Sequence, residues 1–390
     1  MAVNLTNADS ALKSVYLDAI TTQLNDNVNP FLAAIEKSSN DVYGKEVRKL
    51  AIYGMNGGIG AGTEDGELPH AAGNNYGQFV TTLKNLYGVI EISDKAIRAS
   101  ENNAGAFVNL LNAEMDGLIK ASTFNLGRML FGNGKGVVSK VLGVTDGIVI
   151  VDEVQNFIEG MPIDFRDASG NIIDGNRRVQ AVDNTNKLIM LSGEPASLAK
   201  TPIGTLITVQ GSYNNEITGL GTLFDYENPT IYGLDKYNNS WLNPYILTEV
   251  GEIDEMKIQS ALDNIEANSG QAVNFIMCSW GVRRALLKML SQNKRTVDTM
   301  ELAGGFKALS YNGIPIVVDR FCPRGNMYLL NTNDFALHQL CDWQWLTDDD
   351  GKVLHQLPGK PVYSATLVKY ADLICSRPNG QGLLSGITEA

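Results

Sequence analysis

Two glycine-rich stretches contain residue types that bind phosphate in other proteins. Gly58 to Gly62 has the spacing of part of a dinucleotide loop, and Gly132 to Gly136 places Lys135 among glycines. A dinucleotide loop runs directly into a helix, and a phosphate-binding lysine loop also needs a Ser or Thr for magnesium. Thr63 to Pro69 does not read as a helix, and the second stretch ends a helical pattern instead of beginning one. We therefore interpret the first stretch as a hairpin tip and the second as a helix terminus.

Residues that could bind metal or act as nucleophiles are present, but they lack the spacing of known sites. Asp348 to Gly351 resembles the start of a calcium loop, yet Lys352 to Leu354 stand where that loop needs oxygen ligands. Neither HExxH nor CxxC spacing occurs among His70, His338, His355, Cys278, Cys322, Cys341 and Cys375. We interpret the cysteines as buried thiols. We expect no catalytic residue, no cofactor, no metal and no enzymatic activity.

The densest basic patch has few aromatic neighbours. It consists of Arg283, Arg284, Lys288, Lys294 and Arg295, with Trp280 nearby. Single-strand nucleic-acid sites interleave cations with aromatic rings, and a net charge of −12 argues against a general phosphate-backbone binder. Both observations favour a solvated face or a salt-bridge surface between copies, so Arg283 and Arg284 are candidate contact residues. A protein that encloses nucleic acid without gripping it is still compatible with this charge.

The elements that must position these residues belong to a chain of ordinary core-forming composition. Its 390 residues are 44% apolar, enough for two or three domains. Only 19% are charged and 39 are glycine, a profile typical of strands and loops. We find no secretory signal pattern and no apolar run of membrane-spanning length. We therefore expect a soluble protein that is made in the cytoplasm and does not insert into a membrane.

A long helix is predicted from Asp94 to Phe131. Ser93 or Asp94 suits its N-cap, and Gly132 suits its end. Residues 103 to 131 alone would span about 43 Å, whereas a compact chain of this size has a radius of gyration of about 21 Å. The helix should therefore cross the whole molecule. Its apolar stripe is Phe107, Leu111, Met115, Leu118, Ser122, Leu126 and Met129.

A long hairpin is predicted before this helix. Its outgoing arm begins at Lys45, its return arm runs from Gln78 to Ser93, and the tip between them contains eight glycines over residues 53 to 77. Arms of this length reach about 65 Å, and an isolated two-stranded hairpin is marginal in water. We infer that the hairpin is ordered by packing against a neighbouring copy.

The rest of the chain divides into an arm, a β-rich module and an α/β region. Residues 1 to 44 hold a short amphipathic helix, Ala11 to Leu24, with too little apolar surface for a domain. Closely spaced turns predict a small barrel or sandwich at residues 137 to 220. Residues 226 to 245 read as a connector. The α/β region combines a helix around Ile258 to Ile265 and a basic helix around Arg283 to Leu290 with strands Val273 to Cys278, Ile314 to Asp319, Met327 to Leu330 and Val362 to Cys375.

This order of pieces resembles the major capsid proteins of tailed phages, which have the Hong Kong 97 fold. The resemblance is carried by four stretches: Thr82 to Ser93, Ala104 to Leu111, Gly313 to Asp319 and Gly325 to Asn331. It implies an α+β fold with an N-terminal arm (1–44), an E-loop (45–92) and a peripheral domain with a spine helix (93–136 and 362–390). It also implies an inserted β-domain (137–220) and a connector with an axial domain (221–361).

The resemblance further implies pentamers and hexamers that close into an icosahedral shell around double-stranded DNA. The expected location is the virion, after synthesis in the host cytoplasm. The expected partners are other copies of the chain, scaffolding and portal proteins, and a decoration protein on the inserted domain. As contacts between copies we predict Glu64, Asp65 and Glu67 of the loop tip against Lys120 and Arg128 of a neighbouring spine.

The chain departs from some members of that family in two respects. Some shells are locked by an isopeptide bond from a lysine in the E-loop, but residues 53 to 78 contain no lysine. We therefore expect no cross-link of this kind. A fused scaffolding segment has no room in a 44-residue arm, so we expect a separate scaffolding protein or none.

Two alternative functions remain open from the sequence. An encapsulin, a cellular cargo shell, has the same fold, although the inserted β-module and the glycine-rich hairpin favour the phage version. A β-rich binding module on a virion or cell surface would instead be a monomer or small oligomer. That reading offers no reason for so long a helix.

Overall fold

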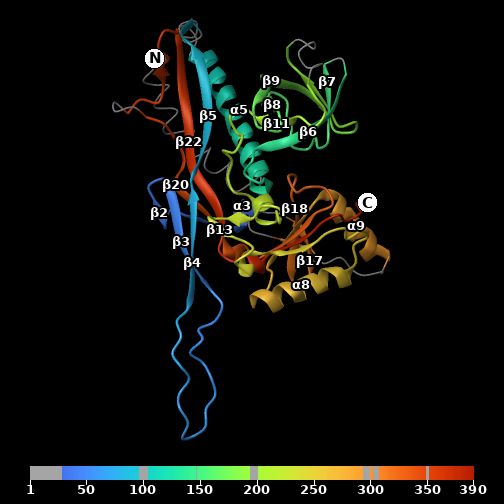
Figure 1. Cartoon of the computed structure of the whole chain (residues 1–390). Helices are drawn as coiled ribbons and strands as arrows, with labels where there is room; N and C mark the ends of the chain where they lie inside the picture. The colour runs from blue at the N-terminus through green and yellow to red at the C-terminus, as the bar shows by residue number, and fades with distance from the viewer. Residues whose placement is uncertain are drawn as a thin grey trace.

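A body with a long projecting hairpin makes up the molecule (Figure 1). The computed structural model describes residues 29–95, 104–145, 147–193, 201–292, 299–301, 307–347 and 351–390. The predicted arm helix, the predicted acidic turn at 348–350, and Lys294 and Arg295 lie outside these residues. No helix among the described residues is long and apolar enough to cross a membrane.

The centre of the body is a long strand, β22 (Val362–Cys375), which has the predicted bounds. β20 (Phe335–Trp345) and the short β21 (His355–Gln356) pair with it, as does β5 (Lys84–Ser93). β1 (Glu36–Ser38) adds to β20 in parallel. Strand β20 was not predicted. Its polar residues interrupt the apolar pattern that marks a buried strand.

The spine helix α5 (Ala104–Phe131) runs beside β5 and β22 (Figure 1). It ends at Phe131, as predicted, while residues 96–103 of the predicted helix lie outside the described part. Gly88 of β5 allows α5 to pack closely against the strand, since a Cβ at this position would lie 2.7 Å from Leu118 Cδ1. Of the predicted stripe, Met115, Leu126 and Met129 are buried, Leu118 and Ser122 are half-buried, and the side chains of Phe107 and Leu111 are not described.

The predicted hairpin divides differently from the expectation. β3 (Glu46–Tyr53) pairs with β4 (Asn75–Thr82), and β2 (Val42–Tyr43) borders β3. The return arm does not continue to Ser93 as one strand. Strand β4 ends at Thr82, and after Leu83 the chain continues as β5, which pairs with β22 and not with β3. Residues 54–74 form the tip and contain no strand.

Six strands between Val137 and Val209 form a closed barrel of order β10-β7-β6-β11-β8-β9, which lies beside α5 (Figure 1). Its interior is a separate apolar core that includes Val141, Ile163, Phe165, Ile189 and Ile207. The structure thus decides between the two predicted forms in favour of a barrel. The strands are β6 (Val137–Thr145), β7 (Ile148–Val151), β8 (Pro162–Arg166), β9 (Ile172–Asp183), β10 (Leu188–Leu191) and β11 (Leu206–Val209).

A seven-stranded sheet and two helices form the α/β region. The order is β14-β23-β19-β15-β18-β17-β16. Ile276 and Cys278 of β15 pack with α8 and α9, while Phe275 and Met277 join the core of the body, so both helices cover one face of the sheet. The bounds are β14 (Tyr245–Leu247), α8 (Glu255–Ser269), β15 (Phe275–Cys278), α9 (Trp280–Gln292), β16 (Thr299–Glu301), β17 (Lys307–Tyr311), β18 (Ile314–Val318), β19 (Met327–Leu330) and β23 (Gly382–Leu384).

Short elements connect these parts. They are α3 (Pro30–Ala34), α7 (Leu220–Leu223), β12 (Thr230–Ile231), β13 (Leu234–Asp235), η2 (Ser240–Leu242), η3 (Thr332–Asp334) and η4 (Pro378–Gly380). The turn after β18 joins the α/β region to the spine, because Phe321 packs edge-on against Phe124 at 5.1 Å. Gly127 makes room for this ring.

Candidate inter-subunit surfaces

The outer face of the hairpin exposes large apolar side chains beside the polar Arg48 and Gln78. Side chains alternate along β3, so Val47 and Ala51 are buried while Leu50 and Ile52 are 60% and 64% exposed. Ile52 stands opposite Tyr76, which is 56% exposed. Three large apolar side chains therefore share one face of a two-stranded ribbon, and we call Leu50, Ile52 and Tyr76 the hairpin face.

The two edges of the ribbon are also open. The Arg48 amide donates to Asp41 O and the Val80 amide donates to Tyr232 O, so these opposed residues direct their backbone groups outward. In an antiparallel pair this direction repeats every second residue. Leu50 and Ile52 on β3, and Gln78 and Tyr76 on β4, therefore also present their backbone groups at the edges, where no described strand pairs with them. Such edges can receive a strand from another chain.

One tryptophan of the connector holds the β3–β4 ribbon to the body close to where the tip begins. Trp241 stacks on Tyr53 at 4.7 Å and lies 5.6 Å from the ring of Phe79. Gly77 allows this close approach, since a Cβ there would lie 3.1 Å from the indole. Sequence analysis missed Trp241 because its partners are more than 150 positions away. The aromatic contacts fix the direction in which the hairpin leaves the body.

The tip carries the predicted acidic contact residues. Glu64, Asp65 and Glu67 are exposed, and none of the ion pairs among the described residues involves them. The Gly66 amide donates to Thr63 O and closes a turn between them. Figure 1 shows that the tip projects away from the body, so its three exposed carboxylates belong to a projecting segment.

The structure separates the two predicted cationic partners on the spine. Lys120 is exposed, so it stays a candidate contact residue. Arg128 is buried, and its guanidinium donates to both carboxylate oxygens of Glu216 and to Asn125 Oδ1 within the same chain. The prediction for Arg128 was therefore wrong. Helical spacing alone could not reveal a partner 88 positions further along the chain.

The predicted basic helix around Arg283 to Leu290 corresponds to α9. Arg283, Arg284 and Lys288 are exposed on α9, together with Trp280 and Leu287, on one face of the helix. The Arg284 side chain also donates to Ala390 O. Arg283 and Arg284 therefore lie where another copy can reach them.

The two glycine-rich stretches considered for phosphate binding lie at the hairpin tip and at the end of α5. Residues 58–62 lie in the hairpin tip, and no helix follows them. Gly134 and Gly136 follow the end of α5 with positive φ angles of 76° and 73°, a conformation that favours glycine. Among the described residues, no group of three or more His, Cys, Asp or Glu side chains could hold a metal ion.

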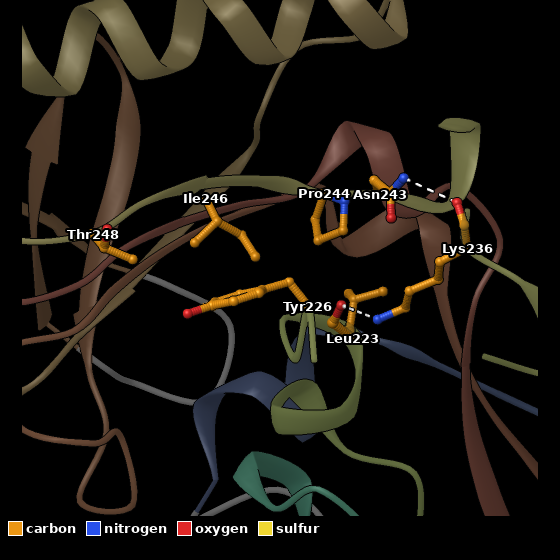
Figure 2. A pocket seen from close by; sticks show the side chains of 7 residues that line it. All are labelled: Leu223, Tyr226, Lys236, Asn243, Pro244, Ile246 and Thr248. Carbon is orange, nitrogen blue, oxygen red and sulfur yellow. Dashed lines mark hydrogen bonds between the residues drawn. The ribbon is translucent and has the colours of Figure 1, made fainter. Parts of the chain in front are cut away.

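A pocket of about 360 Å³ lies between α7, the connector and β14. Figure 2 shows the side chains that line it. Lys236 Nζ donates to Asp225 O at 2.7 Å, and Asn243 Nδ2 donates to Lys236 O at 3.2 Å. Burial lowers the pKa of Lys236. These groups already have partners within the connector, so we assign them a structural role.

Comparison with solved structures shows the fold. A chain of the Cyanophage A-1(L) capsid asymmetric unit aligns over 95% of this chain and 93% of its own, with 12% identity and a TM-score of 0.54. Lower scores are found for the SrpI encapsulin of Synechococcus elongatus PCC 7942 (92% and 88% covered, 9% identity, TM-score 0.47) and the capsid of a native GTA particle (95% and 90%, 11%, 0.48). No protein-family model matches the chain, and no curated protein matches it in sequence. The chain has the α+β capsid fold of the Hong Kong 97 type, as the sequence resemblance indicated.

Proposed function

We propose that this chain is the major capsid protein of a tailed phage, assembling into pentamers and hexamers that form an icosahedral shell. The fold shared with a cyanophage capsid protein supports the proposal. The observation that carries it is the hairpin, whose apolar face and open edges lie outside the core of their own chain. A surface of this kind is explained by a neighbouring copy that covers it.

The proposal gives each part of the chain a place in the shell. Residues 45–82 serve as the E-loop that lies over a neighbour. The spine with β5 and β22 forms the peripheral domain, because β5 pairs with β22 and not with the hairpin. The barrel is an inserted domain that can receive a decoration protein, and residues 221–361 include the axial domain. Residues 1–44 serve as the arm. The shell encloses double-stranded DNA without sequence-specific contacts, in keeping with the net charge of −12.

Assembly also involves charged contacts and other proteins. The acidic tip, Glu64, Asp65 and Glu67, approaches Lys120 of an adjacent spine. A portal protein completes the particle, with a separate scaffolding protein or with none. Reversing the tip charges or the Lys120 charge should each reduce assembly, and combining both reversals should restore it. Lack of recovery in the combined variant would count against this pairing.

Electron microscopy of the purified protein, with and without its scaffolding partner, tests the function. The wild type should form uniform closed particles or discrete hexamers and pentamers. The double variant Leu50→Asp and Ile52→Asp should stay folded but fail to form them, because charges on the hairpin face resist burial. A matched control, Ile172→Asp with Met190→Asp on exposed barrel positions, should assemble. A wild type that stays monomeric under every condition would refute the proposal.

The particle contents separate a phage shell from a cargo shell. Particles made during infection should contain double-stranded DNA. Particles that contain a specific enzyme and no genome would indicate an encapsulin. Extraction of nucleic acid and mass spectrometry of the contents distinguish the two.

A further inference from the structure

The two helices on the outer face of the α/β sheet carry opposite charge. Residues 252 to 270, which include α8, contain five acids and one lysine, and residues 280 to 292 of α9 contain three cations and no acid. Glu252, Asp263 and Glu266 are exposed, as are Arg283 and Lys288. The face thus has an acidic helix and a basic helix.

These charges are not paired with each other within the described chain. None of the ion pairs among the described residues joins α8 to α9. Lys257, the one cation within residues 252 to 270, donates to Val250 O and Glu252 O, and Arg377 donates to Ser269 O at the end of α8. Glu389 lies close to the start of α9, but its carboxylate accepts from Ser279 Oγ and the Gly325 amide. Both helices therefore keep charges that another molecule can meet.

The topology directs the two helices toward different edges of the sheet. α8 contacts β14 and β23, the two strands at one edge. The chain leaves β15 through α9 and continues to β16 at the other edge. A surface at one edge that complements a surface at the other edge favours a head-to-tail contact. Repeated head-to-tail contacts generate a ring when the rotation between successive copies closes.

Each helix also offers an apolar anchor among its charges. Trp280 on α9 is 53% exposed, and Met256 on α8 is 76% exposed. Interfaces commonly surround an aromatic or methionine anchor with charged residues that fix orientation. A solvated surface gives no reason to expose a tryptophan beside three cations.

We propose that the basic face of α9 (Trp280, Arg283, Arg284 and Lys288) binds the acidic face of α8 (Met256, Asp263 and Glu266) of the next copy, closing the ring of each capsomer. The proposal rests on the shell function above and names the contact that makes the rings. Because the contact is heterologous, each copy uses both faces at once. The same contact serves pentamers and hexamers through a small change of angle.

Charge reversal on each helix tests the contact. The variants are Arg283→Glu with Lys288→Glu on α9, Asp263→Lys with Glu266→Lys on α8, and all four together. Arg284 is left unchanged because it contacts Ala390 O. Lys140→Glu with Arg178→Glu, at exposed barrel positions, makes the same charge change as the α9 variant and is the control. Mass photometry counts free subunits and rings, and circular dichroism confirms that each variant is folded.

We expect each double variant to lower the fraction of rings at least tenfold, about 1.4 kcal/mol of association free energy. The fourfold variant should recover most of it, and the control should resemble the wild type. Rings of the wild type should also weaken as salt is raised, a readout that needs no variant. Double variants that form rings like the control, or a fourfold variant without recovery, would overturn the contact. A wild type that forms no rings would instead refute the shell function.

Discussion

Replacing Arg128 with methionine should destabilise the fold by leaving Glu216 as an unpaired buried charge. The two side chains are 4% and 2% exposed. The guanidinium also donates to Asn125 Oδ1 at 2.7 Å, so every part of its charge faces protein. Removing one partner of such a pair costs about 3–5 kcal/mol, most of it the penalty of the remaining ion.

The double variant Arg128→Met with Glu216→Leu should recover most of this loss. Replacing both members of a buried ion pair by apolar residues is often neutral, because neither charge then needs solvation. The comparison between single and double variants therefore separates the buried charge from simple loss of volume.

Urea unfolding of the unassembled protein at one fixed concentration measures these changes. The concentration must be fixed because association stabilises the folded state. Arg324→Met, at an exposed arginine, is the matched control and should change stability by less than about 0.5 kcal/mol. A loss below about 1 kcal/mol for Arg128→Met would refute the reasoning. It would mean that Arg128 is solvated and again available to a neighbouring copy.

Three further predictions concern residues in the turn after β18, in helix α5 and in the connector. Burial raises the pKa of Asp319 to about 7 from 3.8, so its contribution to stability is present at low pH and is lost as pH rises through about 7. Asp319→Asn should remove this dependence and raise the unfolding free energy at pH 8 by up to about 4 kcal/mol, measured by urea unfolding across pH. Gly127→Ala should destabilise by about 1–3 kcal/mol, because its Cβ would lie 2.4 Å from the Phe321 ring. Gly117→Ala, with open space around its Cβ, should stabilise the same helix by up to about 1 kcal/mol, and thermal unfolding compares the two. Trp241→Ala should cost about 3 kcal/mol and speed proteolytic cleavage of the hairpin, while the barrel keeps its resistance.

Sequence patterns located the elements whose apolar residues are continuous in the chain. β22 and β19 have the predicted bounds, and α5 ends where Gly132 indicated. These elements are buried on one or both faces, so their composition reports their burial directly. The barrel followed from the spacing of turns, which does not depend on tertiary contacts.

Features set by distant partners were not predictable in the same way. β20 contains His338 and Asp342, whose partners come from other segments of the chain: His338 Nδ1 bonds with Asn40 O, and Asp342 accepts from Lys369. Burial of these groups is acceptable only because the fold supplies the partners. The prediction for Arg128 failed for the same reason. Its charge suggested an exposed position, but its ion pair with Glu216 is buried.

The buried polar groups of the body show which part of the subunit can change shape. Asp372 of β22 accepts from Thr81 Oγ1 of β4 and from the Thr218 amide, and burial raises its pKa. This carboxyl therefore links the end of β4 that is furthest from the tip to the sheet that contains β5, β20 and β22. Beyond Tyr53 and Asn75 no comparable link holds the ribbon, and residues 54–74 contain no strand. In the proposed shell, subunits in rings of different curvature must differ somewhere, and the least constrained segment adapts at the lowest cost. The tip is therefore where pentamer and hexamer subunits should differ most, while the Asp372 link stays the same in both.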